Sequence, residues 1–211
     1  MRVCCWVLDE SKFLSTGEVR RLLRAAEARA HSGEASGNNA AVRDYFIVHL
    51  GLSTGLRVSE MANLKCGHLF LGDGMASLVV RMGKGGKTRS VPFNGAFKSH
   101  VEQYLRWKEQ TGEPISDDAP LLQSRATGRG MTTRALQKAF KRAAAGAGLG
   151  PHHSIHSLRH TYACHLYRAS GWNLRLVQKQ LGHSSIATTQ VYADVMEPDA
   201  RRALERLYTQ G

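Results

Sequence analysis

Residues 154–165 read SIHSLRHTYACH and place three nitrogen-bearing side chains where they can act together. If this stretch is helical, His156, Arg159 and His160 fall on one face, because residues three and four apart are neighbours on a helix surface. Such a face can bind a metal ion through its histidines or a phosphate through its arginine. It can also be an ordinary polar helix surface, and the stretch alone leaves these choices open.

The metal interpretation has weak support. His156 and His160 have the spacing of two zinc ligands on a helix, but Ser157 stands where the H-E-x-x-H pattern requires a glutamate. Arg159 on the same face would also repel a cation. We therefore expect neither a metal ion nor a cofactor at this site.

A second candidate is the glycine-rich segment GKGGKT at 83–88, whose end resembles a phosphate-binding P-loop. The full pattern requires glycine at position 81, where this chain has Arg81, and a helix after the loop, whereas RSVPF at 89–93 reads as a strand. An NTPase is therefore excluded. Lys84 and Lys87 are left either as ordinary lysines of an exposed turn or as functional cations.

The elements that must position these residues are mostly helices. Ser15 or Thr16 can cap a helix over 18–30, and residues 31–39 read as a loop. Further helices are predicted at 42–53, with Gly55 as a break, and at 58–64, 97–110 and 132–147. From His156 the chain reads as helical nearly to its end, with breaks near Gly171, Gly182 and Pro198.

The exception is the segment between Ser77 and Phe93. Two β-branched runs, SLVVRM and TRSVPF, flank GKGGK, which predicts an antiparallel hairpin with Lys84 at its tip. The predicted fold class is therefore α+β and mainly α, with a small antiparallel sheet.

Composition points to a polyanionic partner. The 211 residues fit one domain, and 29 Lys and Arg against 17 Asp and Glu give a formal charge of +12. Nucleic acid is the simplest partner for such a chain, although a genome's compositional bias produces the same balance. The cysteines lack metal-ligand spacing or a disulfide framework, and no signal peptide or membrane span is evident, so we expect a cytoplasmic protein without a membrane partner.

Five short motifs occur in a recognisable order, and together they resemble the tyrosine recombinases, the phage-integrase family of site-specific DNA recombinases. They are TGLRVSE at 54–60, GKGGK at 83–87, HSLRH at 156–160, LGHSS at 181–185 and TTQVYADV at 188–195. The resemblance runs from about FLSTGEVRRLL to the C-terminal helix, and it includes the nine-residue step from His183 to Tyr192.

The resemblance implies a tyrosine-recombinase catalytic fold, a helical bundle with a small antiparallel β-sheet on one edge. It implies a catalytic domain over residues 11–211, with 1–10 as an N-terminal extension and a tail helix at about 197–209. The family's catalytic set falls on Arg57, Lys84, His156, Arg159, His183 and Tyr192, and all six positions match in residue type.

The implied roles agree with the chemistry of phosphoryl transfer. Tyr192 would be the nucleophile, Lys84 the general acid and His156 the general base. The remaining three, Arg57, Arg159 and His183, would stabilise the extra negative charge of the transition state, a task for which the planar, permanently charged arginine fork is well suited. We expect the nearby cations to lower the pKa of the Tyr192 phenol.

Two neighbours are assigned supporting roles. Glu60, three residues after Arg57, is expected to orient an arginine, with a solvent-facing helix carboxylate as the alternative. His160 resembles the second histidine that the family often carries in this motif, and we expect it to support the site from behind the reacting groups.

The expected activity is cleavage and rejoining of double-stranded DNA through a 3′-phosphotyrosyl link, without ATP or metal. The resemblance implies a dimer on each site and a tetramer at synapsis. The C-terminal helix is expected either to dock on a neighbouring copy or to pack on its own domain, and the sequence leaves both open. An accessory DNA-bending protein is a further partner that the resemblance allows. Many members carry a separate DNA-binding domain before the catalytic one, for which this chain has no room. Three interpretations follow: a naturally minimal recombinase, a fragment of a longer one, or a gene remnant that binds weakly. For the activity, a DNA-binding regulator that keeps the fold and a type IB topoisomerase are the alternatives.

Overall fold

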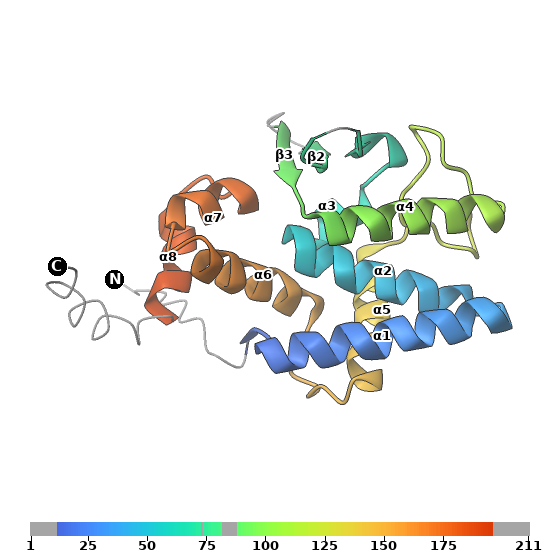
Figure 1. The fold of residues 1–211 in the computed structure, drawn as a ribbon, viewed down its shortest axis with the longest axis horizontal. Helices are drawn as coiled ribbons and strands as arrows, with labels where there is room; N and C mark the ends of the chain where they lie inside the picture. The colour runs from blue at the N-terminus through green and yellow to red at the C-terminus, as the bar shows by residue number, and fades with distance from the viewer. Residues whose placement is uncertain (1–11, 73, 82–87, 196–211) are drawn as a thin grey trace, which may run out of the picture.

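The computed structural model describes residues 12–72, 74–81 and 88–195. Helices dominate, and a small sheet lies beside α3 and α4 (Figure 1). The helices are α1 (Thr16–Ser36), α2 (Asn39–Thr54), α3 (Val58–Ala62), α4 (Gly95–Gln110), α5 (Thr133–Gly146), α6 (Ile155–Ala169), α7 (Leu174–Leu181) and α8 (Ala187–Val195). A short 3-10 helix, η2 (Cys66–His68), precedes the strands β1 (Leu69–Phe70), β2 (Ser77–Arg81) and β3 (Thr88–Pro92).

Helix α1 begins where the sequence predicts and ends later. The Ser15 hydroxyl accepts a hydrogen bond from the Glu18 amide, and the Glu18 carboxylate accepts one from the Ser15 amide, which is a complete capping box. The loop predicted at 31–39 is wrong, because the helix continues to Ser36. Gly33 faces α2 so closely that a Cβ there would lie 2.9 Å from the Ala41 Cβ, so this glycine serves helix packing and does not break the helix.

Helix α2 ends shortly before Arg57, the first candidate catalytic residue along the chain. It ends at Gly55, whose φ of 61° is in the left-handed region that favours glycine. A Cβ at this position would lie 2.3 Å from Tyr162 Cδ1. The predicted break at Gly55 is confirmed, and the chain turns there to place Arg57 at the start of α3.

The sheet is antiparallel with strand order β1-β2-β3. Strands β2 and β3 pair from Ser77 opposite Pro92 to Arg81 opposite Thr88, which confirms both predicted strands. Strand β1 was not predicted, because two residues carry too little periodicity to show. Residues 82–87, where the sequence predicts the turn with Lys84, lie outside the described residues.

The predicted fold class is confirmed, and so are the helices over 97–110 and 132–147 and the breaks near Gly171 and Gly182. The predicted break at Pro198, the predicted extension at 1–10 and the predicted tail helix at 197–209 lie outside the described residues. Within the described part of the chain, no helix is long and apolar enough to cross a lipid bilayer.

The apolar core is divided into two clusters. The large one is built from α1 to α5, the sheet and the start of α6, and it contains fully buried aromatic residues such as Phe46, Phe97 and Phe140. The small one lies among α6, α7 and α8, which Figure 1 shows grouped at one end of the molecule. Its buried members are Ala163, Cys164, Val177, Leu181 and Tyr192.

A buried histidine pair joins α2 to α4. The Nδ1 atoms of His49 and His100 lie 2.8 Å apart, and the rings pack among Tyr45, Phe46 and Phe97. Burial lowers the pKa of His49 to about 4, although Glu27 opposes the shift, and burial together with His49 lowers the pKa of His100 to about 3. Both rings are therefore neutral at pH 7, and one ring donates to the other.

Because of this pair, we expect the protein to become less stable as the pH is lowered. In the unfolded chain the two histidines have pKa values near 6.5 and bind protons below that pH. In the folded protein both rings stay unprotonated down to about pH 4. The contribution of the pair to the free energy of unfolding is therefore fully present above pH 6.5, and it decreases as the pH falls from 6.5 toward 4. We expect the double substitution His49→Gln and His100→Gln to reduce the loss of Tm between pH 7 and pH 5, measured by circular dichroism. The exposed His31→Gln should leave that loss unchanged, and an equal effect of both variants would contradict the prediction.

Candidate active site

Arg57 is the N-cap residue of α3, and Glu60 lies in the first turn of that helix. The Glu60 carboxylate accepts hydrogen bonds from the Arg57 amide at 2.8 Å and from the Arg57 Nη1 at 3.0 Å. Only 8% of the Glu60 side chain is exposed, so it is not a solvent-facing carboxylate, whereas 37% of the Arg57 side chain is exposed. The carboxylate holds one edge of the guanidinium, and the remaining donors are left for a ligand.

Arg159 is held from three directions. It projects from α6, where its Nη1 donates to the Gly55 carbonyl at 2.6 Å and its Nη2 donates to the Leu181 carbonyl at 2.9 Å. Its Nη2 also lies 2.9 Å from the His183 Nε2. Burial, followed by the charge of Arg57, lowers the pKa of Arg159 to about 10, so the guanidinium is still charged at neutral pH.

His183 lies in the turn after α7, where Gly182 adopts a φ of 64°. Because arginine can only donate, the His183 Nε2 must accept from Arg159, and the Nδ1 then carries the proton and donates to the Thr189 hydroxyl at 2.9 Å. Burial, with Arg159 next, lowers the pKa of His183 to about 4. The neutral ring thus links Arg159 to α8.

Tyr192 is on α8 and is 2% exposed. Its hydroxyl lies 3.2 Å from the Nδ1 of His160, which projects from α6 one residue after Arg159. Burial, with His156 next, lowers the pKa of His160 to about 4, so the ring is neutral at pH 7 and able to accept a proton. The sequence placed His160 behind the reacting groups, whereas the structure brings it into direct contact with the tyrosine hydroxyl.

The expected lowering of the Tyr192 pKa is wrong for this structure. Burial raises the pKa of the phenol to about 12, although Arg159 and Arg57 act in the opposite direction. The phenol is therefore protonated at neutral pH. The sequence showed the cations and not the depth at which the hydroxyl lies, and burial disfavours the charged phenolate more than the two arginines favour it.

The remaining two candidates are placed differently. His156 is exposed on α6 and makes no hydrogen bond within the part of the chain that the structure describes, so it stands open to an incoming ligand. Lys84 lies outside the described residues, between β2 and β3. Among the described residues, no three His, Cys, Asp or Glu side chains are grouped so that they can hold a metal ion.

The sequence missed Arg89 on β3. Its Nη1 and Nη2 donate to the two Glu60 carboxylate oxygens at 2.8 and 2.9 Å. Its Nε also donates to the Gln180 carbonyl at 3.3 Å. An arginine in a predicted strand carries no local signal of such a partner, because Glu60 is 29 residues away.

The site therefore gathers two arginines, two neutral histidines and a tyrosine from α3, α6, the turn after α7, and α8. A family model described as "Phage integrase family" matches residues 12–198. The chain belongs to the phage integrase family. The predicted resemblance is thus confirmed over all of the described residues.

Curated members of the phage integrase family match over much of the chain. Tyrosine recombinase XerD of Ralstonia nicotianae is 37% identical over 201 residues, which are 94% of this chain and 59% of the relative. Tyrosine recombinase XerC of Serratia marcescens is 38% identical over 152 residues, 72% of this chain and 48% of the relative. The chain therefore spans about half to three-fifths of the length of these relatives.

Solved structures of the family agree with the fold. The XerA recombinase is 28% identical with a TM-score of 0.74, over 94% of this chain and 66% of that one. XerH site-specific recombinase, bound to palindromic difH substrate in a post-cleavage complex, is 26% identical with a TM-score of 0.73, over 93% of this chain and 52% of that one.

Proposed function

We propose that this chain is the catalytic part of a site-specific DNA recombinase that cleaves and rejoins DNA through Tyr192. The observation that carries the proposal is the cluster of Arg57, Arg159 and His183, in which both arginines lie near enough to the Tyr192 phenol to lower its pKa against the effect of burial. The XerC and XerD relatives are tyrosine recombinases by name, and XerH is described in a post-cleavage complex with its DNA substrate. The charge of +12 supports binding to a polyanion.

The proposed chemistry is a transesterification. The Tyr192 Oη attacks the scissile phosphorus, the bond from phosphorus to the 5′ oxygen breaks, and a 3′-phosphotyrosine and a 5′ hydroxyl result. The tyrosine proton passes to a base, assigned to His156, and Lys84 protonates the departing oxygen. A 5′ hydroxyl then reverses the step and releases the tyrosine, so the bond energy is conserved and no ATP is consumed.

The two arginines supply the electrostatic part. A pentacoordinate phosphorane carries more negative charge than the diester, and preorganised donors in a buried site stabilise that charge most. Arg159 is fixed by two backbone carbonyls and His183, so little reorganisation is needed when the phosphate arrives. In the proposed complex the His183 ring leaves Arg159 and takes its other neutral tautomer, in which Nδ1 accepts from the Thr189 hydroxyl and the protonated Nε2 donates to the phosphate.

The proposal extends to assembly. Residues 11–211 form the catalytic domain, two copies bind each DNA site, and four meet at synapsis. The helix expected at 197–209 is proposed to dock on a neighbouring copy, as the resemblance implies. A lambda integrase described as a dimer bound to a core site supports the idea of paired copies on DNA by its shared fold.

Covalent trapping tests the function. The protein is expressed in its host, and the cells are lysed under denaturing conditions. DNA that remains attached to the protein is recovered, and its ends are sequenced. We expect defined 3′ ends, and mass spectrometry should find the nucleotide on the peptide that carries Tyr192. A host that lacks the gene serves as the control.

Different outcomes separate the alternatives. Native enrichment of DNA without covalent attachment would contradict strand cleavage and favour the DNA-binding regulator. Attachment spread over the genome without common ends, together with relaxation of plasmids that lack any trapped sequence, would favour the topoisomerase.

A further inference from the structure

The Glu60 carboxylate is surrounded by three arginines. Arg57 and Arg89 hydrogen bond to it, and the Arg159 Nη1 lies 3.9 Å from its Oε2. Burial raises the pKa of Glu60, but the hydrogen bonds from Arg89 and Arg57 outweigh burial and hold it below its usual range. The carboxylate is therefore charged, and three cations share one anion.

The three arginines differ in what they offer to a ligand. Arg89 is 12% exposed and spends both Nη atoms on the two oxygens of Glu60. Arg57 spends one Nη on Glu60 and is 37% exposed. Arg89 is thus the counter-ion of the carboxylate, and Arg57 keeps the larger part of its fork available.

Arg89 also reaches the turn that carries His183. Its Nε donates to the Gln180 carbonyl, and a Cβ added to Gly182 would lie 2.8 Å from its Cδ. The absence of a side chain at Gly182 lets the arginine pass between β3 and the end of α7. One side chain thus links the sheet, α3 and the His183 turn.

We propose that Arg89 is a positioning residue for the strand-cleavage step: it neutralises Glu60 and so leaves Arg57 and Arg159 free to act on the scissile phosphate. The inference rests on the proposed function. Three guanidinium groups and one carboxylate leave two net positive charges, and without Arg89 only one remains. The carboxylate oxygens released by Arg89 would recruit Arg57 into a two-point pair and draw it from the phosphate.

The competing explanation is that Arg89 only ties β3 to α7. Glu60→Gln separates the two explanations, because glutamine has nearly the same shape without the charge. If Arg89 serves to neutralise Glu60, then removal of the Glu60 charge compensates for removal of Arg89. If Arg89 is only a tie, the second substitution restores nothing.

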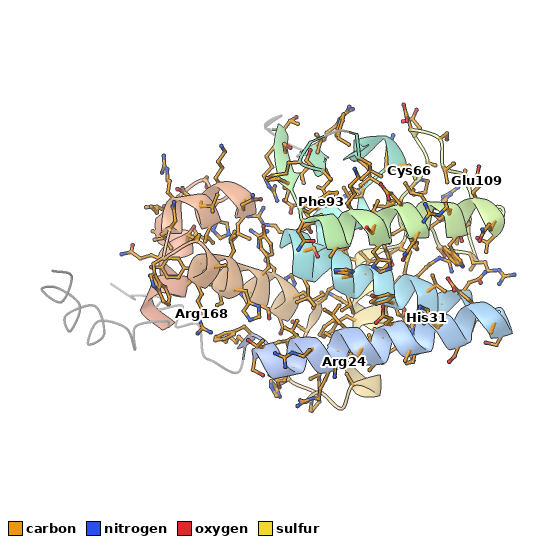
Figure 2. The ribbon with its side chains drawn as sticks, viewed as in Figure 1. Arg24, His31, Cys66, Phe93, Glu109 and Arg168 are labelled. Carbon is orange, nitrogen blue, oxygen red and sulfur yellow. The ribbon has the colours of Figure 1, made fainter. Side chains whose placement is uncertain are left out.

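The test compares the wild type with Arg89→Met, Glu60→Gln and the double variant. Single-turnover cleavage is measured at saturating concentrations of a duplex recovered by covalent trapping. We expect Arg89→Met to slow cleavage about 30-fold, with the DNA affinity changed much less, and the double variant to recover about tenfold. Arg24→Met, at the exposed position labelled on α1 in Figure 2, removes one charge elsewhere and should cleave at the wild-type rate.

A second readout does not require cleavage. Inorganic sulfate, a small tetrahedral anion, is titrated into each protein while the ring signals of His183 are followed by NMR. Arg89→Met should weaken sulfate binding several-fold, and the double variant should regain most of it. A double variant that is no better than Arg89→Met in both measurements would overturn the positioning role. If the wild type and the variants bind sulfate in the expected order of affinity but the wild type never cleaves DNA, the proposed function is refuted instead.

Discussion

Tyr192→Phe is expected to reduce covalent attachment to DNA to background. The substitution removes the one oxygen that is proposed to attack phosphorus, and a neighbouring side chain cannot replace it in the same geometry. It also removes the contact with His160, which should cost about 1 kcal/mol of folding stability, the net value of an ordinary hydrogen bond. The variant therefore remains folded and still binds the duplex in a mobility-shift assay, while denaturing gels show no attached DNA.

Tyr162→Phe is the matched control. Tyr162 packs against the same small cluster, and burial also raises its pKa to about 12. The control should keep attachment within about threefold of wild type, because a hydroxyl without a catalytic task contributes about as much as one ordinary hydrogen bond. Attachment that survives in Tyr192→Phe and disappears in Tyr162→Phe would refute the assignment of the nucleophile.

Arg159→Lys is expected to slow single-turnover cleavage about a thousandfold, the upper end of what loss of one preorganised donor costs. Lysine keeps the charge, but its single ammonium cannot donate to the Gly55 and Leu181 carbonyls and to a phosphate with the fixed fork of arginine. The buried carbonyls would compete with the DNA for the remaining donors. The rate is measured by rapid quench at saturating DNA, so that weaker binding does not enter.

Arg142→Lys supplies the comparison for Arg159. Arg142 makes an equally good two-point pair, with the Asp44 carboxylate at 2.9 and 2.6 Å, but it lies on α5 and serves the packing against α2. Its replacement should lower the Tm and leave the cleavage rate near that of wild type. Equal losses of rate in both variants would show that Arg159 acts through stability alone.

Local sequence patterns predicted the elements better than their ends. The Ser15 and Glu18 capping box is contained in four consecutive residues, so the start of α1 was visible. The end of α1 could not be predicted in the same way. The glycine-rich run after residue 30 resembles a loop in sequence, but it stays helical in the structure because Gly33 packs closely against Ala41 on the next helix. A glycine that permits close helix packing and one that ends a helix look alike until the neighbour is placed.

The contacts and the burial of the site residues likewise depend on tertiary placement. The motifs identified Arg57, Arg159, His183 and Tyr192 because their types and order are local facts. They could not show that Arg89 shares Glu60 with Arg57, since that pairing exists only once β3 lies beside α3. They also could not show that the Tyr192 hydroxyl is buried, which reversed the expected direction of its pKa shift.

The division of the core has a consequence for hydrogen exchange. Tyr192 is itself a member of the small cluster, whose five buried residues hold α6, α7 and α8 together, whereas the large cluster holds the rest. Opening of a region costs free energy in proportion to the contacts it loses, so amides of α7 and α8 should exchange with solvent faster than those of α2 and α5. The proposed nucleophile is thus anchored in the smaller of the two clusters, which should open at a lower cost than the large one.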